Sequence, residues 1–291
     1  MLISIFSKIK FKITAGLTAI LLALLLNSCT SLLTGTVIQP AVGNLQKQSD
    51  VELVCEGSPA YLLMIDSLIE SNPNNRDLLL IGAKAYSGSA AALISCDAFP
   101  ERIKAISEKA KHYGQRLLDP LLPIKTVSRP EFTEALNALT KRDADYLFWG
   151  AFGWLTWVTQ QQGSPSSMVD LVAIEQIMQR LLTLDESVEN GSPHLFFGAL
   201  YGSKPQMLGG DSERSRKHFE QALVLSNRSF LLVQTTFAET YCRMTFNKEM
   251  HDALLQEVIN FPLEQAPENT LSNQIAKRKA VALLEEDFFG N

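Results

Sequence analysis

Apolar residues follow a helical repeat along most of the chain. Between residues 59 and 288 they recur at spacings of three and four, the pattern of helices that bury one face. Caps and short polar or proline-containing turns interrupt the pattern, as in "SNPNN" at 71–75 and "QGSPSS" at 162–167. No segment has the pattern of a strand. We therefore predict an all-α fold of about eleven helices, over residues 59–71, 76–95, 101–118, 130–141, 144–161, 168–185, 193–202, 212–225, 229–244, 248–260 and 270–285.

Short helices with tight connections favour stacked antiparallel helix pairs over one closed bundle. The segment from His194 has the residue sizes of a degenerate tetratricopeptide repeat. An insertion at 203–211 makes the connection between its two helices about five residues longer than a standard repeat allows. We predict a right-handed superhelix of such helix pairs. The repeat positions are Phe197, Gly198 and Tyr201 on the first helix, and Ser215, Phe219 and Ala222 on the second.

The stretch "LFWGAFGWLTWV", residues 147–158, contains all three tryptophans of the chain and no charge. Wound as a helix it is apolar on every side, so it must be buried all round. Its two glycines lower helix stability by roughly 1 kcal/mol each, which indicates close approach by a neighbouring backbone or by a ligand. Core packing and a ligand-contacting wall both remain open. The candidate ligand or cavity residues are Trp149, Gly150, Gly153, Trp154, Trp157, Phe197 and Tyr201.

The N-terminus has the features of an export signal. Lys8, Lys10 and Lys12 precede an apolar run at 13–26, and "LNSC" at 26–29 resembles the lipobox of bacterial lipoproteins, although Asn27 departs from it. We expect a signal peptide at 1–28, a lipidated Cys29 with a tether at 29–50, and a helical domain at 51–291. The alternative is a soluble secreted protein. The absence of Asp after Cys29 resembles the sorting of periplasmic lipoproteins to the outer membrane.

Charge and motifs exclude several functions. Three lysines and no acidic residue lie in the first 28 positions, so the mature chain has 23 basic and 31 acidic residues and a net charge of −8. A nucleic-acid partner is therefore not expected. No metal, nucleotide or nucleophile motif is present, and the four histidines are isolated along the chain. We predict no enzyme activity, no metal and no cofactor.

Three cysteines, Cys55, Cys96 and Cys242, remain in the mature domain, where the compartment is oxidising. Cys55 precedes one predicted helix and Cys96 follows the next, and these two ends are neighbours in an antiparallel pair. A Cys55–Cys96 disulfide is one possibility, and two buried free thiols are the other.

From residue 59 to 289 the chain resembles the T-component (TatT) family of TRAP transporters, which are periplasmic lipoproteins built from tetratricopeptide-like helices. The stretches that carry the resemblance are "AYLLMIDSLIESNPNNRDLLLIGAKAY", "YLFWGAFGWLTWV", "HLFFGALYGSKPQMLGGDSERSRKHFEQAL" and "LSNQIAKRKAVALLEEDFF". Ser107 departs from it, where a repeat helix usually has an aromatic residue. The resemblance implies a homotrimer, a TRAP-type substrate-binding protein as partner, and a hydrophobic cavity that holds a small molecule.

Two functions follow from these observations. The first is a lipid-anchored periplasmic adaptor that docks a substrate-binding protein in solute uptake. The second is an envelope scaffold lipoprotein with tetratricopeptide repeats and no link to transport.

Overall fold

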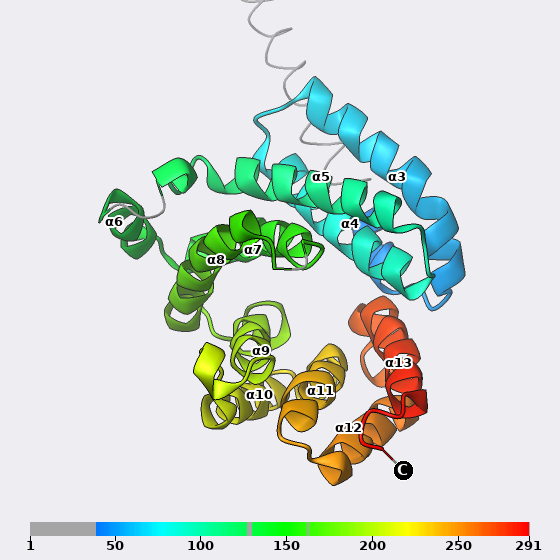
Figure 1. Ribbon diagram of the computed structural model, residues 1–291. Coiled ribbons are helices and arrows are strands. Elements are labelled where there is room, and N and C mark those ends of the chain that lie inside the picture. The colour runs from blue at the N-terminus through cyan, green and yellow to red at the C-terminus, as the bar shows by residue number, and fades with distance from the viewer. Residues whose placement is uncertain (1–38, 127–129, 162, 291) are drawn as a thin grey trace, which may run out of the picture. The chain divides into compact units, whose positions relative to one another are not determined.

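The computed structural model describes residues 39–126, 130–161 and 163–290, and residues 45–291 form one compact unit. The predicted signal peptide and Cys29 lie outside the described residues. Among the described residues there are twelve α-helices and no strand, which confirms the all-α prediction (Figure 1). The helices are α2 (Gln39–Gln46), α3 (Val51–Ser71), α4 (Arg76–Ser95), α5 (Pro100–Leu118), α6 (Pro130–Ala138), α7 (Ala144–Val158), α8 (Pro165–Leu184), α9 (Val188–Gly202), α10 (Ser212–Leu225), α11 (Leu232–Phe237), α12 (Lys248–Asn260) and α13 (Thr270–Glu285).

Most helix boundaries agree with the periodicity of the sequence, and α3 is the clearest exception. It begins at Val51, eight residues before the predicted start, because the Asp50 carboxylate accepts a hydrogen bond from the Leu53 N–H at 2.9 Å and caps the first turn. The helix continues through Pro59, which the sequence pattern had suggested as its first residue. Two further elements differ from the prediction. Helix α2 lies inside the segment predicted to be a tether. The helix predicted at 229–244 is the short α11, followed by a π-helical turn at Ala238–Cys242.

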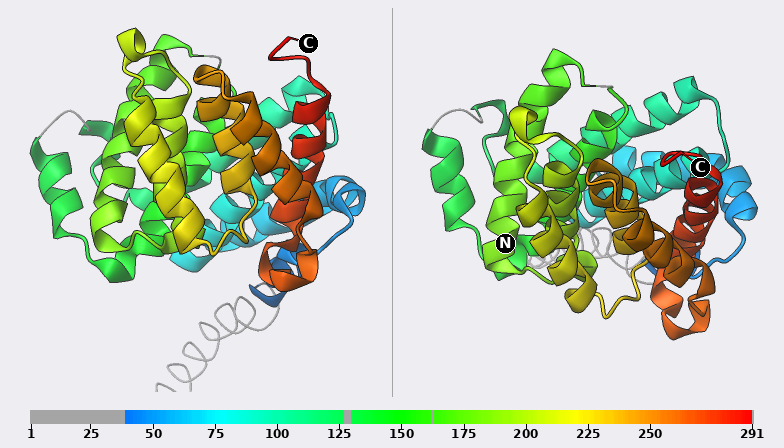
Figure 2. Two further views of the ribbon diagram at one scale, coloured as in Figure 1. Left: turned by 90° about the horizontal axis from the view of Figure 1, so that it is seen from below. Right: turned by 60° about the horizontal axis from the view of Figure 1, so that its bottom comes forward.

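Consecutive helices pack on one another around a circuit (Figure 1). Within the unit 45–291, α3 packs on α4, α4 on α5, α5 on α7, and α7 on α8, and the series continues through α9 and α10 to α12 and α13. The short α6 contacts α8 at the outer edge of this circuit. Figure 2 shows the same helices from two other sides. The division into helix pairs, the handedness of the superhelix and the repeat assignment remain predictions.

The last helix returns to the first helix pair, because α13 contacts both α3 and α4. Val51, Val54, Ala92 and Leu271 form a small buried apolar cluster at this contact. An open solenoid leaves apolar faces at its two ends, and these faces must be capped or covered. Here the two ends of the unit cover each other, so the packing of the ends gives no separate argument for an oligomer.

Most of the interior belongs to two apolar clusters. One joins α5 to α9 and includes Leu147, Phe148 and Ile177, and the other joins α9 to α13 and includes Phe219 and Phe237. Helix α4 is the one described helix that is long and apolar enough to cross a membrane, but 67 % of its apolar window is buried in the protein. Its position against α3, α5, α7 and α13 accounts for that composition, because a helix with four neighbours needs apolar faces in several directions.

Candidate functional site

The two glycines of the tryptophan-rich helix face α5. A Cβ atom added to Gly153 would lie 2.6 Å from the Ala110 carbonyl oxygen, and one added to Gly150 would lie 2.5 Å from Leu118 Cγ. Gly114 completes the contact from α5, since its own added Cβ would lie 2.5 Å from the Gly150 carbonyl oxygen. The absence of side chains therefore lets the α5 and α7 backbones approach each other. Sequence reasoning had identified the α7 half of this crossing and missed Gly114.

The three tryptophans of α7 have different surroundings. Trp154 is buried in the apolar cluster between α5 and α9. Trp157 is half-buried, and its ring lies under the Lys111 ammonium group, with Nζ 3.5 Å from the ring centroid. Lys111 also forms a 2.6 Å ion pair with Asp170 on α8. Trp149 packs against the same cluster and also contacts Lys84 of α4 and Glu189 of α9.

Trp149 belongs to a charged cluster in which α4, α7 and the start of α9 meet. Its indole N–H donates to the Glu189 carboxylate at 2.5 Å, and the Lys84 ammonium lies 4.7 Å from its ring centroid. Lys84 and Glu189 also form an ion pair at 3.3 Å, with both side chains about three-quarters buried. The ammonium group lies over the electron-rich face of the indole, and the carboxylate accepts from the indole N–H. Each charge therefore lies where the ring attracts it.

The backbone that carries Glu189 is left-handed over three successive residues. The φ angles of Glu189, Asn190 and Gly191 are +46°, +61° and +77°. Only glycine adopts this region without steric cost, so Glu189 and Asn190 require support from their surroundings. The "ENG" triplet is a turn signal that marks this bend, and it offered the one sequence clue to Glu189. No sequence signal identified Lys84, whose role depends on a contact 105 residues away.

A second aromatic cluster lies between α9 and α10. Phe197 is buried, and its ring stacks on Tyr201 and on His218, with centroid distances of 5.9 and 5.3 Å. Burial and, to a smaller extent, the neighbouring charges of His194 and Arg214 together lower the pKa of His218 to about 4. The two histidines, 24 residues apart, face each other with their Nδ1 atoms 3.0 Å apart. Sequence reasoning had treated them as isolated.

An open groove of about 620 Å³ lies between the end of α9, the start of α10 and the π-helical turn. Tyr201 is the one candidate cavity residue that lines it. The insertion at 203–211, which lengthens the connection between the two repeat helices, forms one wall of this groove. The lining residues are Tyr201, Gly202, Lys204, Pro205, Gln206, Gly210, Asp211, Ser212, Glu213, Tyr241, Met244 and Thr245.

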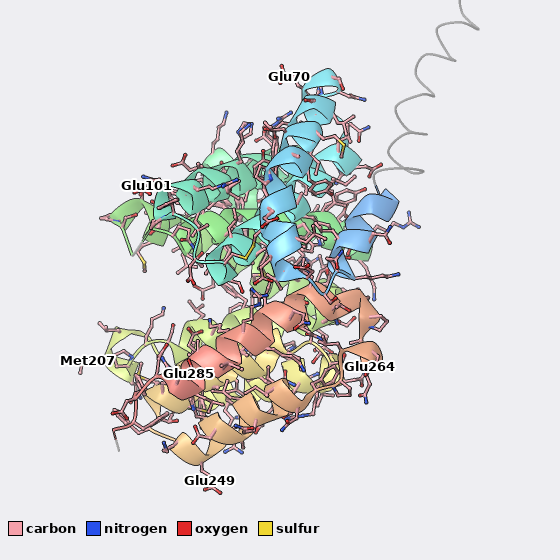
Figure 3. All side chains as sticks on the ribbon, turned by 90° about the vertical axis from the view of Figure 1, so that its right-hand side faces the viewer. Glu70, Glu101, Met207, Glu249, Glu264 and Glu285 are labelled. Atoms are coloured by element: carbon pink, nitrogen blue, oxygen red, sulfur yellow. A yellow bond between two sulfur atoms is a disulfide. The ribbon has the colours of Figure 1, made fainter. Side chains whose placement is uncertain are left out.

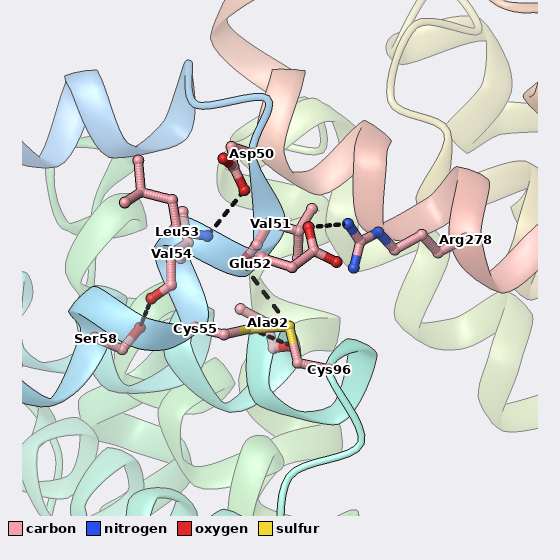
Figure 4. The surroundings of a disulfide bond; sticks show 10 residues. All are labelled: Asp50, Val51, Glu52, Leu53, Val54, Cys55, Ser58, Ala92, Cys96 and Arg278. Atoms are coloured by element: carbon pink, nitrogen blue, oxygen red, sulfur yellow. Dashed lines mark hydrogen bonds and ion pairs between the residues drawn. A yellow bond between two sulfur atoms is a disulfide. The ribbon is translucent and has the colours of Figure 1, made fainter.

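Cys55 and Cys96 are joined by a disulfide, with an S–S distance of 2.18 Å and Cα atoms 6.7 Å apart (Figure 4). The bond links the first turns of α3 to the C-terminal end of α4, where α13 also packs. Cys242 is a buried free thiol, and burial raises its pKa to about 12. A thiol with so high a pKa carries almost no thiolate at neutral pH and is therefore unreactive.

Among the described residues, no group of three or more histidine, cysteine or acidic side chains is arranged to hold a metal ion. His112 and His251 are not part of the His194–His218 pair. His251 is buried beside Asp252, with Nδ1 2.8 Å from a carboxylate oxygen. The polar clusters around Trp149 and His218 join helices to one another.

The chain matches the TRAP transporter T-component family over residues 47–289. The comparison with curated proteins found no match. The matched region begins just before α3 and ends after α13, so it contains the tryptophan-rich helix, the groove and the contact between the first and last helices. A match over most of the sequence establishes the relationship, and this chain belongs to the TRAP transporter T-component family.

Proposed function

We propose that this chain is a lipid-anchored periplasmic adaptor of a TRAP-type solute uptake system, and that it docks the substrate-binding protein of that system. The observation that carries the proposal is the family match over 243 residues from 47 to 289. The groove beside the 203–211 loop supports it, because Tyr201, Tyr241 and Met244 line it and such side chains are enriched in contacts between proteins. The polar clusters that join helices favour binding over catalysis.

The proposed assembly is a homotrimer, and the number of subunits comes from the family resemblance alone. Light scattering on a soluble form that lacks residues 1–29 tests it. A mass three times that of the chain supports the trimer, and a monomer at tens of micromolar contradicts it.

A ligand-holding role concerns the aromatic residues that are partly exposed. Trp149, Trp157 and Tyr201 are half-buried, whereas Trp154 and Phe197 are enclosed in the core. Gly150 and Gly153 face the α5 backbone, and a small molecule cannot contact them without separating the two helices. We propose that a hydrophobic solute contacts the exposed part of Trp149, whose indole is held in place by Lys84 and Glu189. Binding would be read as a change in tryptophan fluorescence that Trp149→Phe removes.

Membrane attachment is proposed from the export signal and the lipobox at 26–29. Cys29 would be the first residue of the mature chain and carry the acyl groups, with the protein on the inner leaflet of the outer membrane. Metabolic labelling with a fatty acid tests this: Cys29→Ala should abolish the label and release the protein from membranes. Unchanged labelling would contradict it. Fractionation of the inner and outer membranes then tests the sorting.

A further inference from the structure

Two histidines are brought together where α9 crosses α10. The helices approach closely at Gly198, since a Cβ added there would lie 2.9 Å from the Phe219 ring, and the Ser215 hydroxyl donates to the Gly198 carbonyl at 2.7 Å. His194 lies one turn before Gly198 on α9, and His218 lies one turn after Ser215 on α10. Because the crossing fixes both helices, it holds the two imidazole rings against each other.

The separation of the two rings is close to that of histidines that share a metal ion. The His194 and His218 Nδ1 atoms lie 3.0 Å apart. Two imidazole nitrogens bound to one ion at about 2.0–2.1 Å lie about 2.9 Å apart at a right angle and about 3.3 Å apart at the tetrahedral angle. The observed distance falls between these two values. A cation can therefore replace the hydrogen between the rings once they rotate to aim both lone pairs at it.

Glu186 determines which nitrogen of His194 carries the hydrogen. Its carboxylate oxygen lies 3.1 Å from His194 Nε2, and because an ionised carboxylate only accepts, Nε2 donates. The neutral ring then has its lone pair at Nδ1, and in the metal-free chain the His218 Nδ1–H donates to that lone pair. A carboxylate on the outer nitrogen is the usual partner of a metal-binding histidine, because it orients the ring and raises its basicity.

Solvent reaches the edge of this histidine pair. The side chains of His194 and Glu186 are 12 % and 49 % exposed, and His218 is half-buried. The Glu186 carboxylate favours a cation beside it, whereas the Arg214 charge opposes one. The Arg214 guanidinium lies 4.0 Å from the Tyr201 ring centroid and donates to the Tyr201 hydroxyl, so it interacts with that ring rather than with either histidine.

We propose that His194 and His218 bind a divalent transition-metal ion through their Nδ1 atoms, with Glu186 behind His194 and water in the remaining positions. Imidazole ligands select Zn²⁺, Ni²⁺ or Cu²⁺ over Mg²⁺ and Ca²⁺, which take oxygen ligands. Binding moves the His218 hydrogen from Nδ1 to Nε2, so the neutral pair releases no proton. The bound ion joins α9 to α10 and stabilises the folded chain by mass action.

This site is independent of the adaptor role. It differs from the expectation that the chain binds no metal, which rested on the wide spacing of the four histidines along the sequence. The antiparallel crossing of α9 and α10 brings together two of them that are 24 positions apart.

The experiment is isothermal titration calorimetry with Zn²⁺ at pH 7 on the metal-free soluble form that lacks residues 1–29 and carries no affinity tag. The compact unit at 45–291 is intact in this form. We expect saturable binding of one ion per chain. His194→Gln and His218→Gln should each weaken it by about tenfold or more. The matched control is His112→Gln, which removes an exposed histidine of α5 and should bind as the unaltered chain does.

A second pair of variants tests the carboxylate. Glu186→Gln removes the charge behind His194 and should weaken Zn²⁺ binding by about tenfold. Glu264→Gln makes the same change at an exposed position elsewhere and should have little effect. The acidic side chains labelled in Figure 3 lie apart from one another, and no three acidic, histidine or cysteine groups of the described chain are arranged around an ion. Isolated carboxylates of this kind are not expected to compete with the histidine pair.

Thermal unfolding gives an independent readout. Zn²⁺ should raise the Tm of the unaltered chain and of His112→Gln, and should leave the Tm of His218→Gln unchanged. If a histidine variant does not fold, the comparison of Glu186→Gln with Glu264→Gln decides. The site is overturned if the unaltered chain shows no saturable binding up to millimolar Zn²⁺. It is also overturned if His218→Gln binds as tightly as the unaltered chain, or if His112→Gln loses binding as well. None of these outcomes bears on the adaptor role.

Discussion

The Glu52 carboxylate near the start of α3 accepts a hydrogen bond from the Arg278 guanidinium of α13 at 2.5 Å. The two residues are 226 positions apart, and their contact lies where the last helix meets the first helix pair. Arg278 holds the pKa of the Glu52 carboxyl below its usual range. Glu52 is largely exposed and Arg278 is about one third exposed, so water screens the pair and it contributes little to stability. The apolar cluster beneath it supplies most of the contact.

Loss of the Cys55–Cys96 disulfide should destabilise the domain. The bond spans 41 positions and braces the helix pair against which α13 packs. In the chain-entropy model a loop of that length is worth about 4 kcal/mol. Cys55→Ser/Cys96→Ser should therefore lower the free energy of unfolding by that order, and with it the midpoint of chemical unfolding. A variant with the midpoint of the unaltered, oxidised chain would contradict the account.

The thiols should be distinguishable by alkylation. In a soluble form that lacks residues 1–29, native protein should take up no iodoacetamide, because Cys242 is buried with its pKa raised to about 12. Unfolding without reductant should expose one thiol, and unfolding with reductant should expose three. Mass spectrometry counts the labels. Three labels without reductant would show that no disulfide forms.

Gly153→Ala should destabilise the fold although alanine favours helices. Alanine improves helix propensity by about 1 kcal/mol. At Gly153 the new methyl group would lie 2.6 Å from the Ala110 backbone carbonyl oxygen, and the overpacking costs about 1 to 3 kcal/mol. We expect a net loss in the free energy of unfolding, measured with urea.

The matched control is Gly88→Ala on α4. Gly88 is exposed, and nothing lies within 4 Å of an added Cβ. The same substitution should therefore stabilise the protein by about 0.5 to 1 kcal/mol. If both variants were stabilised, the close crossing of α5 and α7 would be refuted.

Stability should fall as the pH decreases from about 6.5 to about 4. Burial lowers the pKa of His218 from 6.5 to about 4 in the folded chain, with His194 and Arg214 adding to the effect. In that interval the unfolded chain binds a proton that folded His218 does not, so acid favours unfolding. The stabilisation is fully present above pH 6.5 and is lost as the pH falls to about 4.

The variant His218→Gln isolates this contribution. Its free energy of unfolding should decline less between pH 6.5 and pH 4 than that of the unaltered chain. Parallel curves would show that His218 does not titrate as its surroundings indicate.

Periodicity and caps predicted the helices well because both are local. Helices α4, α10, α12 and α13 have the bounds that the pattern predicted. The start of α3 was misplaced because Pro59 resembles a first helical residue, whereas the Asp50 cap acts eight residues earlier. The return of α13 to α3 could not be read from periodicity, since amphipathic helices do not specify their partners.

The surroundings of the tryptophans were harder to predict for the same reason. The glycines of α7 indicated a close approach, but the choice between a backbone and a ligand depended on α5, where Gly114 faces Gly150. Lys84 and Glu189 meet at Trp149 from helices far apart in sequence. The insertion at 203–211 could be recognised from the sequence, because it makes the connection between two helices too long. The groove could not be predicted, since its other wall is the turn at Tyr241.

The most direct test of the adaptor function is sedimentation velocity of the soluble form, alone and mixed with the substrate-binding protein of the same TRAP system. We predict that the isolated chain sediments as a trimer and that the mixture contains a faster species with both proteins at low micromolar concentration. If the two proteins sediment independently at tens of micromolar, this chain is not an adaptor for that protein, and the envelope scaffold becomes the better account.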